Sequence, residues 1–225
     1  AIGGKVGINI QSLKNEVGAF NFAKKVIIDP IFLKTLPENQ IKSGYAEMVK
    51  HALIYSNSAW NNIKNLNLAN INYNYLDFLI KESVEIKKHF VEKDPHEKNI
   101  REALNFGHTF GHAIESYFNS TVKGILHGEA VAIGLICEIF LSNKILSFNL
   151  EKMFEIIEYL SINFETYQIK SKYYDEIYNY MKHDKKNKNN KITFSLISDI
   201  GKVNINQTCD KKNIFQALNF YYQLS

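Results

Sequence analysis

Cysteine is scarce in this 225-residue sequence, which contains only Cys137 and Cys209. The two residues lie far apart, and neither has a second cysteine at the spacing of a thiolate metal site. We therefore exclude a zinc site built from cysteines. We expect both thiols to be reduced, as they are in a cytoplasmic protein.

Long apolar runs and blocks of one charge are also missing. No stretch approaches the roughly 20 consecutive apolar residues of a membrane span, and no signal-peptide pattern is present. The net charge of +4 is spread along the chain, which argues against a nucleic-acid surface and mildly favours small anionic ligands. With 45% hydrophobic residues, a chain of this length can bury a core, and we expect one domain or one and a half.

The apolar residues recur mainly with the spacing of helices. Pro37, shortly after Thr35, is typical of a helix start, and the pair Asp94-Pro95 is typical of a helix end. Residues 132–136 form the most hydrophobic run, so we expect a central helix that is buried on nearly all sides. The other expected helices cover residues 38–55, a short segment around Trp60, and residues 75–92, 150–160, 173–182 and 211–222.

Two regions depart from this helical pattern. Residues 25–29 have the pattern of a short buried strand that Pro30 ends. Residues 192–196 and 202–205 alternate in polarity as the two arms of a small β-hairpin do. The sequence therefore predicts a mainly α fold that contains a small β-hairpin.

The stretch from residue 101 to residue 112 gathers polar side chains within a few helical turns. Residues three or four apart share one face of a helix, so Arg101, Asn105, His108 and His112 are expected to form a single stripe. The same stretch keeps two glycines where alanine favours a helix more. We interpret the glycines as room for a neighbour, and the stripe as a ligand site.

Histidine pairs leave two interpretations open. Two histidines four residues apart, such as His108 and His112, are commonly surface residues or satisfied core residues. A third histidine, His127, again lies beside a glycine at the start of an apolar run, and three such histidines indicate a metal. Glu47 and His51 are also four residues apart and share one face of the expected helix. They are either an ordinary side-chain pair of that helix or functional residues.

The first twenty residues contain four glycines. Together with Lys5, Lys14 and Asn15, these glycines suggest a loop that holds an anion such as phosphate. A plain turn is an equal alternative, because the stretch lacks the P-loop pattern.

Several motifs, in their order along essentially the whole chain, resemble those of the 3-dehydroquinate synthase family of the shikimate pathway. The matching segments are Gly3-Gly4-Lys5 with Ile8-Asn9, Lys14-Asn15 with Gly18-Ala19-Phe20, Leu33-Lys34-Thr35-Leu36-Pro37, Ala46-Glu47 with Lys50, Arg101 with Leu104-Asn105-Phe106-Gly107-His108-Thr109, Gly111-His112-Ala113, His127-Gly128-Glu129-Ala130 and Asp184-Lys185-Lys186.

The resemblance implies a domain organisation. Enzymes of the family are longer and carry an N-terminal NAD-binding domain of the α/β class. By this resemblance, residues 1–36 are the tail of that domain, with its glycine loop and last strand. Residues 37–225 are then the C-terminal helical domain that binds zinc and substrate. We also expect a homodimer at full length, and little turnover from this chain without the rest of the N-terminal domain.

The resemblance also assigns roles to single residues. Glu47, His108 and His127 correspond to the ligands of Zn²⁺ or Co²⁺, and Glu97 and His112 correspond to the groups that transfer protons. His112 is thus removed from the ligand pair that spacing alone suggests. The remaining correspondences are substrate contacts by Lys5, Asn15, Lys50, Lys87, Arg101, Asn105 and Lys185, and NAD contacts by Lys14, Thr35 and Ser43.

Family chemistry explains why such residues occur together. The implied substrate is the sugar-acid phosphate 3-deoxy-arabino-heptulosonate 7-phosphate, whose carboxylate and phosphate both need cations. NAD transiently oxidises a ring hydroxyl, the metal stabilises the negative charge that develops next to it, and phosphate is eliminated. The hydride then returns, so the net reaction consumes no NAD.

The sequence departs from the family pattern at a few positions. Pro95 replaces a second carboxylate, Leu13 replaces a common glycine, and residues 21–23 differ from the usual sequence. The substrate contact can be Lys185 or Lys186. Two other functions stay open: a related sugar phosphate cyclase or metal-dependent polyol dehydrogenase, and a non-catalytic helical fragment that keeps the motifs.

Overall fold

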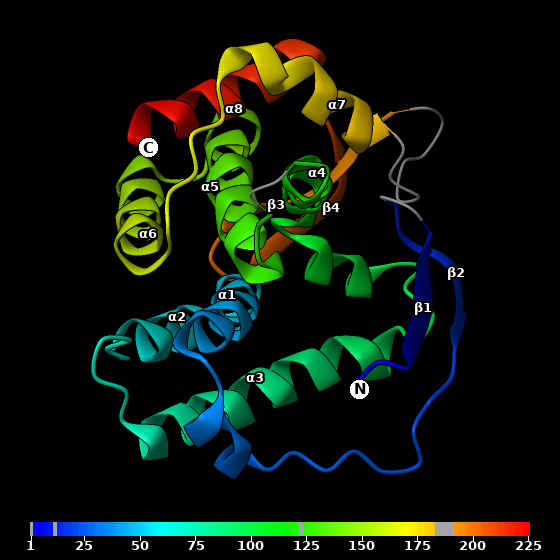
Figure 1. Ribbon diagram of the computed structural model, residues 1–225, viewed down its shortest axis with the longest axis vertical. Helices are drawn as coiled ribbons and strands as arrows, with labels where there is room; N and C mark the ends of the chain where they lie inside the picture. Colours follow the sequence, from blue (N-terminus) through cyan, green and yellow to red (C-terminus); the bar gives the residue numbers. More distant parts are fainter. Residues whose placement is uncertain (1, 11–12, 122–123, 183–190) are drawn as a thin grey trace.

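The computed structural model describes residues 2–10, 13–121, 124–182 and 191–225, and of residues 9–10 and 13–17 only the backbone. The chain is mainly helical, with two small antiparallel hairpins (Figure 1). Its elements are β1 (Lys5–Ile10), β2 (Leu13–Phe20), η1 (Pro30–Thr35), α1 (Glu38–Tyr55), α2 (Asn57–Lys64), α3 (Tyr73–Lys93), η2 (Ile100–Asn105), α4 (His108–Asn119), α5 (His127–Leu146), α6 (Leu150–Asn163), η3 (Ser171–Tyr173), α7 (Tyr174–Lys182), β3 (Thr193–Asp199), β4 (Lys202–Thr208) and α8 (Lys211–Leu224).

The ends of the helices follow local sequence signals. Pro37 immediately precedes α1, and the α3 helix stops one residue before Asp94, ahead of Pro95. The side chain of Asn72 accepts backbone hydrogen bonds at the start of α3, which satisfies N–H groups that have no partner inside the helix. The predicted helices outside residues 101–112 are confirmed, with ends that shift by at most a few residues.

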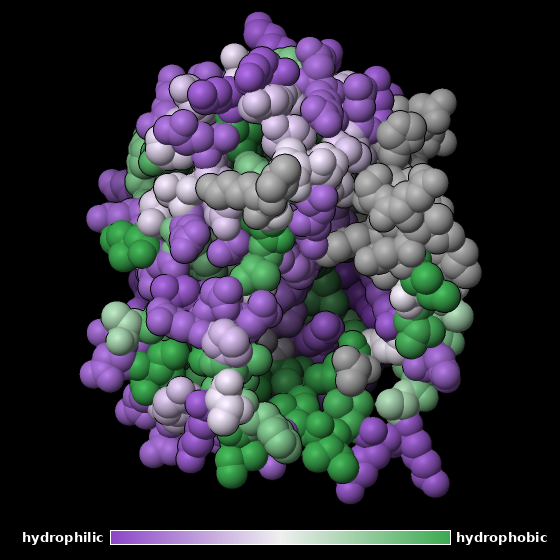
Figure 2. Space-filling view, viewed as in Figure 1, coloured by the Kyte–Doolittle hydropathy of each residue, from purple (hydrophilic) through white to green (hydrophobic). Residues whose placement is uncertain are grey.

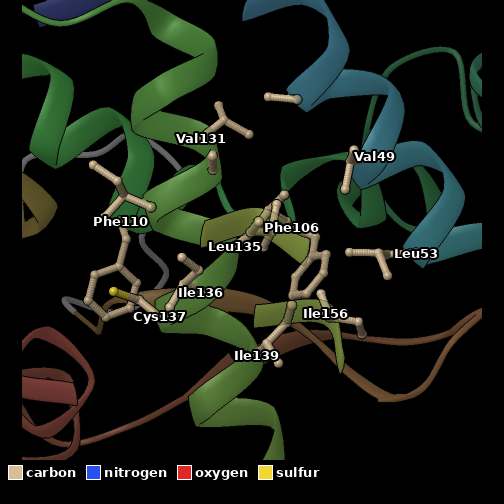
Figure 3. Packing of buried hydrophobic residues seen from close by; sticks show 14 of the residues in the cluster. Val49, Leu53, Phe106, Phe110, Val131, Leu135, Ile136, Cys137, Ile139 and Ile156 are labelled. Atoms are coloured by element: carbon tan, nitrogen blue, oxygen red, sulfur yellow. The ribbon is translucent and has the colours of Figure 1, made fainter. Parts of the chain in front are cut away.

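Helix α5 lies at the centre of the core, as the hydrophobic run predicted. It is buried along most of its length and packs against α1, α4, α6, α8 and β3. Figure 3 shows Leu135, Ile136 and Ile139 of α5 among apolar side chains from α1 and α4. Each such side chain stabilises the folded protein by about 1.5–3 kcal/mol when fully buried. Helix α5 is therefore the element against which the neighbouring helices are positioned.

Glycines allow the helices to approach α5 closely. A Cβ atom on Gly134 of α5 would lie 1.9 Å from the carbonyl oxygen of Gly107. A Cβ atom on Gly128 would lie 2.1 Å from the carbonyl oxygen of Ser43 in α1. Of the two glycines within residues 101–112, a Cβ atom on Gly107 would lie 2.8 Å from the side chain of Leu135, and one on Gly111 would lie 3.2 Å from the carbonyl oxygen of Ala130. The room that we predicted there is therefore taken by α5.

The single stripe predicted over residues 101–112 is wrong. Helix η2 ends at Asn105, and α4 begins only at His108. Between them Gly107 has φ +79°, a left-handed conformation that interrupts any continuous helix. Arg101 and Asn105 therefore lie on a different helical segment from His108 and His112.

The N-terminal region also differs from the prediction. The expected glycine loop is mostly a hairpin, in which Lys5 of β1 pairs with Phe20 of β2. Residues 25–29 form no strand but an exposed irregular segment. Their β-branched residues favour a strand, but a strand needs a hydrogen-bonded neighbour, and the described part of the chain provides none there.

The segment between β2 and α1 carries exposed apolar side chains, among them Ile27 at 80% and Phe32 at 74% exposure. Apolar surface follows the lower edge of the face in Figure 2, where this segment passes.

The second predicted hairpin is confirmed as β3 and β4. Among the described residues, no helix combines the length and the apolar character that crossing a bilayer requires.

Candidate metal and substrate centre

Three potential metal ligands from three helices converge on one point. Glu47 lies in α1, His108 is the first residue of α4, and His127 is the first residue of α5. Glu47 Oε1 lies 3.2 Å from Nε2 of His108 and 3.2 Å from Nε2 of His127. The three ligand atoms all lie within 4.8 Å of one another, which is the arrangement that a carboxylate and two imidazoles need around one divalent ion.

The hydrogen bonding of His108 fixes which ring nitrogen carries its proton. Nδ1 lies 3.1 Å from the carbonyl oxygen of Phe106, which only accepts, so Nδ1 must carry the hydrogen. Burial, with the nearby Lys50 ammonium, lowers the pKa of His108 to about 3, so the ring is neutral. The lone pair of Nε2 therefore faces the Glu47 oxygen, and two facing acceptors call for a cation between them.

The second imidazole has the same orientation for a different reason. Nδ1 of His127 lies 2.8 Å from the carboxylate of Glu115 in α4, so this nitrogen donates and Nε2 faces Glu47. Neutral rings with inward lone pairs are the forms that metals bind.

Glu47 is held as a carboxylate by its neighbours. Burial opposes its ionisation, but the ammonium of Lys50, 2.6 Å from Oε2, holds the pKa of Glu47 well below its usual range. Lys50 itself is buried, at 3% exposure. Burial and the positive charges of Lys50 and Arg101 lower the pKa of Lys87 in α3. Lys50 and Lys87 thus form a cationic area next to the three ligands.

Two buried carboxylates hold the helix starts that carry the histidines. Glu138 of α5 is fully buried and accepts hydrogen bonds from N–H groups at the start of α4. Glu129 accepts one from the backbone N–H of Leu126 and one from the hydroxyl of Tyr167. Sequence reasoning missed Glu138, Glu115 and Tyr167. Glu129 at the third position of α5 supplies only half of a capping box, because the residue before the helix is Leu126, whose side chain cannot accept a hydrogen bond.

Lys5, Glu97 and Asn105 meet at a second polar cluster. The ammonium of Lys5 forms an ion pair with one oxygen of Glu97. The amide of Asn105 donates to the other oxygen at 3.0 Å. Glu97 has φ +54°, an unusual conformation for a residue other than glycine. The structure therefore joins a predicted proton-transfer residue to two predicted substrate contacts.

Arg101 is buried against backbone carbonyl groups. Its guanidinium donates to the carbonyl oxygen of Gly3 at 2.7 Å and to that of Pro95 at 2.5 Å. The carboxylate of Asp94 accepts hydrogen bonds from three backbone N–H groups, including that of Arg101 itself. Arg101 thus connects the N-terminal hairpin to the loop that carries Glu97.

His112 lies beside the three candidate ligands but outside the group whose ligand atoms converge. Its ring centre is 5.2 Å from that of His108 and 5.9 Å from that of His127. His51 does not pair with Glu47, since its Nδ1 lies 2.7 Å from the hydroxyl of Ser83 in α3. The side-chain pair that spacing allowed between Glu47 and His51 is replaced by contacts to other helices.

The other residues predicted to contact NAD or substrate either bond to nearby backbone or have side chains outside the described residues. Ser43 accepts a hydrogen bond from the backbone N–H of Gly128 at 2.9 Å, and Thr35 donates to the carbonyl oxygen of Phe32 within η1. The side chains of Lys14 and Asn15, and the whole of Lys185, lie outside the described residues.

The arrangement has the chemistry to bind a divalent ion beside an anion. The carboxylate and two neutral imidazoles leave positions on the ion for oxygen atoms of a bound molecule. Lys50 and Lys87 offer positive charge to a carboxylate or a phosphate. His112 is a titratable group beside the same three residues.

Two family models match the chain and together cover most of it. Residues 44–187 match the model described as 3-dehydroquinate synthase C-terminal. Residues 1–43 match the model described as 3-dehydroquinate synthase N-terminal.

Curated relatives carry the same description. The chain is 44% identical over 221 residues to the 3-dehydroquinate synthase of Parabacteroides distasonis, a match that covers 98% of the chain and 63% of that relative. It is 40% identical to the 3-dehydroquinate synthase of Dictyoglomus thermophilum, covering 97% of the chain and 61% of that relative. The chain thus spans somewhat less than two thirds of the length of these relatives.

Solved structures share the fold. A 2-deoxy-scyllo-inosose synthase in complex with carbaglucose-6-phosphate, NAD⁺ and Co²⁺ superposes with a TM-score of 0.82 at 26% identity, over 96% of the chain and 61% of that structure. The 2-epi-5-epi-valiolone synthase ValA of Streptomyces hygroscopicus, with NAD⁺ and Zn²⁺ bound, gives a TM-score of 0.81 at 20% identity, over 100% of the chain and 62% of that structure. The second likeness bears on the fold alone.

Proposed function

We propose, since the chain belongs to the 3-dehydroquinate synthase family, that it forms the metal- and substrate-binding part of such an enzyme. The proposed reaction converts 3-deoxy-arabino-heptulosonate 7-phosphate into 3-dehydroquinate and phosphate, with NAD as a cofactor that is regenerated. The observation that carries the proposal is the convergence of Glu47, His108 and His127 beside buried lysines.

The proposed metal ligands are Glu47, His108 and His127, and the proposed ion is Zn²⁺ or Co²⁺. Their fit to a metal is supported by the two Nε2 atoms that both lie 3.2 Å from one oxygen of Glu47, while the Nδ1 atom of each ring already has an acceptor beside it. When bound, the ion supplies a Lewis acid that stabilises negative charge on a substrate oxygen. The 2-deoxy-scyllo-inosose synthase structure, which contains Co²⁺, supports the choice of a divalent ion.

The proposed substrate contacts are cationic or amide side chains. Lys50 and Lys87 lie next to the ligands and can neutralise the carboxylate or the phosphate of the substrate. Further proposed contacts are Lys5, Asn15, Arg101, Asn105 and Lys185, and proposed NAD contacts are Lys14, Thr35 and Ser43. Arg101 and Lys5 now bind protein groups, so binding of substrate requires them to exchange partners.

Glu97 and His112 are the proposed proton-transfer groups. The ring of His112 lies close to those of both proposed ligand histidines, which suits a base beside a bound substrate. Glu97 lies between Lys5 and Asn105, so it can receive or deliver a proton where those side chains hold substrate. Both roles require the group to act on substrate rather than on the ion.

We further propose how the chain is organised and where it acts. Residues 1–36 are the tail of an NAD-binding domain and residues 37–225 the helical domain, in an enzyme that is a homodimer at full length. The two family models meet close to this boundary. A cytoplasmic location is supported by two unpaired thiols, of which Cys137 is buried.

The test is an assay of product formation with NAD⁺, Co²⁺ and the heptulosonate phosphate. It uses the chain joined to the part of the Parabacteroides distasonis relative that the match leaves uncovered, and calorimetric binding of NAD⁺ verifies the junction. We expect 3-dehydroquinate and phosphate in equal amounts, and no product after Glu47→Gln. Binding of NAD⁺ and Co²⁺ without any turnover would overturn the proposal and favour a non-catalytic role.

A related cyclase is the second candidate, because a 2-deoxy-scyllo-inosose synthase shares the fold at 26% identity. The same assay with glucose 6-phosphate in place of the heptulosonate phosphate distinguishes the two. Conversion of glucose 6-phosphate alone would favour this candidate. The higher identity to curated 3-dehydroquinate synthases leads us to expect conversion of the heptulosonate phosphate.

A further inference from the structure

We propose that Glu115 is a positioning residue of the metal centre, which holds the ring of His127 with its Nε2 lone pair toward the ion. The proposal rests on the proposed function, because it presumes that Glu47, His108 and His127 bind a metal. It adds a residue that contacts none of the reacting atoms. The contact that carries it is the 2.8 Å distance between Nδ1 of His127 and Oε2 of Glu115.

The first step concerns the proton on His127. A carboxylate only accepts hydrogen bonds, so the nitrogen next to Glu115 must be an N–H donor. An imidazole that binds a metal is neutral and has one N–H group, so with that group on Nδ1 the lone pair for the ion is on Nε2. That nitrogen lies 3.2 Å from Oε1 of Glu47. Without Glu115, the ring could place its hydrogen on Nε2, and that tautomer has no lone pair on the nitrogen that faces Glu47.

The second step concerns burial. The side chain of Glu115 is 8% exposed, whereas that of His127 is 35% exposed. Water screens a hydrogen bond to a buried carboxylate little, so this contact orients the ring more strongly than an exposed one can. His108 has a different arrangement, because its Nδ1 faces the neutral carbonyl oxygen of Phe106. The two imidazoles thus have the same tautomer, but only His127 depends on a side chain that can be replaced.

The third step concerns the helix that carries Glu115. His108, His112 and Glu115 follow one another at intervals of four and three residues in α4, so they share one face. Helix α4 therefore supplies one proposed ligand directly and orients another, which comes from α5. Hydrogen bonds of this kind to metal-binding histidines typically change metal affinity about 10- to 100-fold.

The experiment measures Co²⁺ affinity of the chain by competition with a chelator, for the wild type, Glu115→Gln and Glu115→Met. Glutamine still accepts the hydrogen bond but lacks the charge, so we expect Glu115→Gln to lower the Co²⁺ affinity about 10-fold. Methionine offers no oxygen acceptor, so we expect Glu115→Met to lower it up to about 100-fold. Glu155→Gln is the matched control, because Glu155 also accepts side-chain hydrogen bonds, from Trp60 and Lys64, but lies in α6. We expect its Co²⁺ affinity to equal that of the wild type.

A double-mutant cycle separates positioning from a general effect on folding. If Glu115 acts through His127, then Glu115→Met adds little to the loss already caused by His127→Ala. Equal losses from Glu115→Met with and without His127 would overturn the inference, as would unchanged affinity in both Glu115 variants. Thermal melting of the metal-free variants identifies any that do not fold. If Glu115→Met does not fold, the Co²⁺ affinity of Glu115→Gln tests the inference instead. A wild-type chain that binds no Co²⁺ would instead refute the proposed metal centre itself.

Discussion

The Glu138 carboxylate accepts a hydrogen bond from the backbone N–H of Gly107 at 2.7 Å, across 31 positions of the sequence. Its other oxygen lies 3.0 Å from the N–H of Thr109. The N–H groups at the start of a helix have no partner within the helix. A residue of the central helix therefore provides the N-terminal cap of α4, and so determines where His108 is placed.

Glu138→Met should destabilise the protein by about 2–4 kcal/mol, because it leaves several buried N–H groups without an acceptor. Glu138→Gln should cost less, since one amide oxygen can still accept. The free energy of unfolding from urea denaturation measures both. Glu151→Met serves as the control, because Glu151 is exposed in the first turn of α6. A loss of the same size in the control would show that the cap contributes nothing specific.

Gly134→Ala should destabilise the protein by about 2–3 kcal/mol through overpacking. The new Cβ atom would lie 1.9 Å from the carbonyl oxygen of Gly107, so α4 and α5 would have to separate. Gly44→Ala is the matched control, since a Cβ atom there has no neighbour within 4 Å. Alanine at position 44 should stabilise α1 by about 0.5–1 kcal/mol. Thermal melting compares the two, and equal melting temperatures would contradict the proposed helix contact.

Glu47→Ala should abolish both metal binding and turnover, whereas His112→Ala should lower turnover and keep the metal. The reason is that Glu47 faces both ligand nitrogens, while His112 lies beside the group. Elemental analysis of purified protein gives the metal content, and the product assay described above gives the rate. Equal metal loss in the two variants would contradict this division of roles.

Addition of Zn²⁺ or Co²⁺ should raise the melting temperature, because an ion that binds only the folded state stabilises it. At 100 times the dissociation constant the gain is about 2.7 kcal/mol, or roughly 5–10 °C for a chain of this size. Differential scanning fluorimetry measures the shift. In Glu47→Gln the shift should vanish, and a shift that persists there would place the ion elsewhere.

The stability of the protein should fall in acid partly through Asp94. Hydrogen bonds from the backbone N–H groups of Lys98, Asn99 and Arg101 lower the pKa of this carboxyl, against the opposing effect of burial. Because the pKa is lower in the folded protein than in the unfolded chain, the contribution is present above about pH 4. It is lost as the pH falls through the folded pKa.

Asp94→Asn removes this contribution. The difference in the free energy of unfolding between the wild type and this variant should be constant from about pH 7 to pH 5 and narrow toward pH 2. Urea denaturation across this range measures it. A difference that does not change with pH would show that the ionised carboxylate is not what stabilises the loop before Arg101.

The positions of the helices could be predicted because their signals are local. Pro37 and Asn72 mark helix starts through backbone geometry and hydrogen bonds within a few residues. The hydrophobicity of residues 132–136 predicted a helix that the structure buries. The convergence of Glu47, His108 and His127 agrees with the roles that family resemblance implies, and metal binding by these residues stays a prediction.

The failures have one cause. Residues 25–29 have the composition of a strand, but the hydrogen bonds of a strand depend on a neighbour elsewhere in the chain. The stripe over residues 101–112 assumed a continuous helix, and the left-handed Gly107 with its cap from Glu138 interrupts it. Short-range patterns contain no information about contacts of this kind.

The sequence by itself determined which segments are helices, that the core is built around residues 132–136, and which side chains have metal-binding chemistry. Only the tertiary structure decided which nitrogen of each histidine faces Glu47, because that depends on the acceptor at the other nitrogen. For His127 the acceptor is Glu115, 12 positions away and on another helix. Local propensity fixes the backbone of a helix, whereas the direction and the proton of a side chain are set by whatever packs against it.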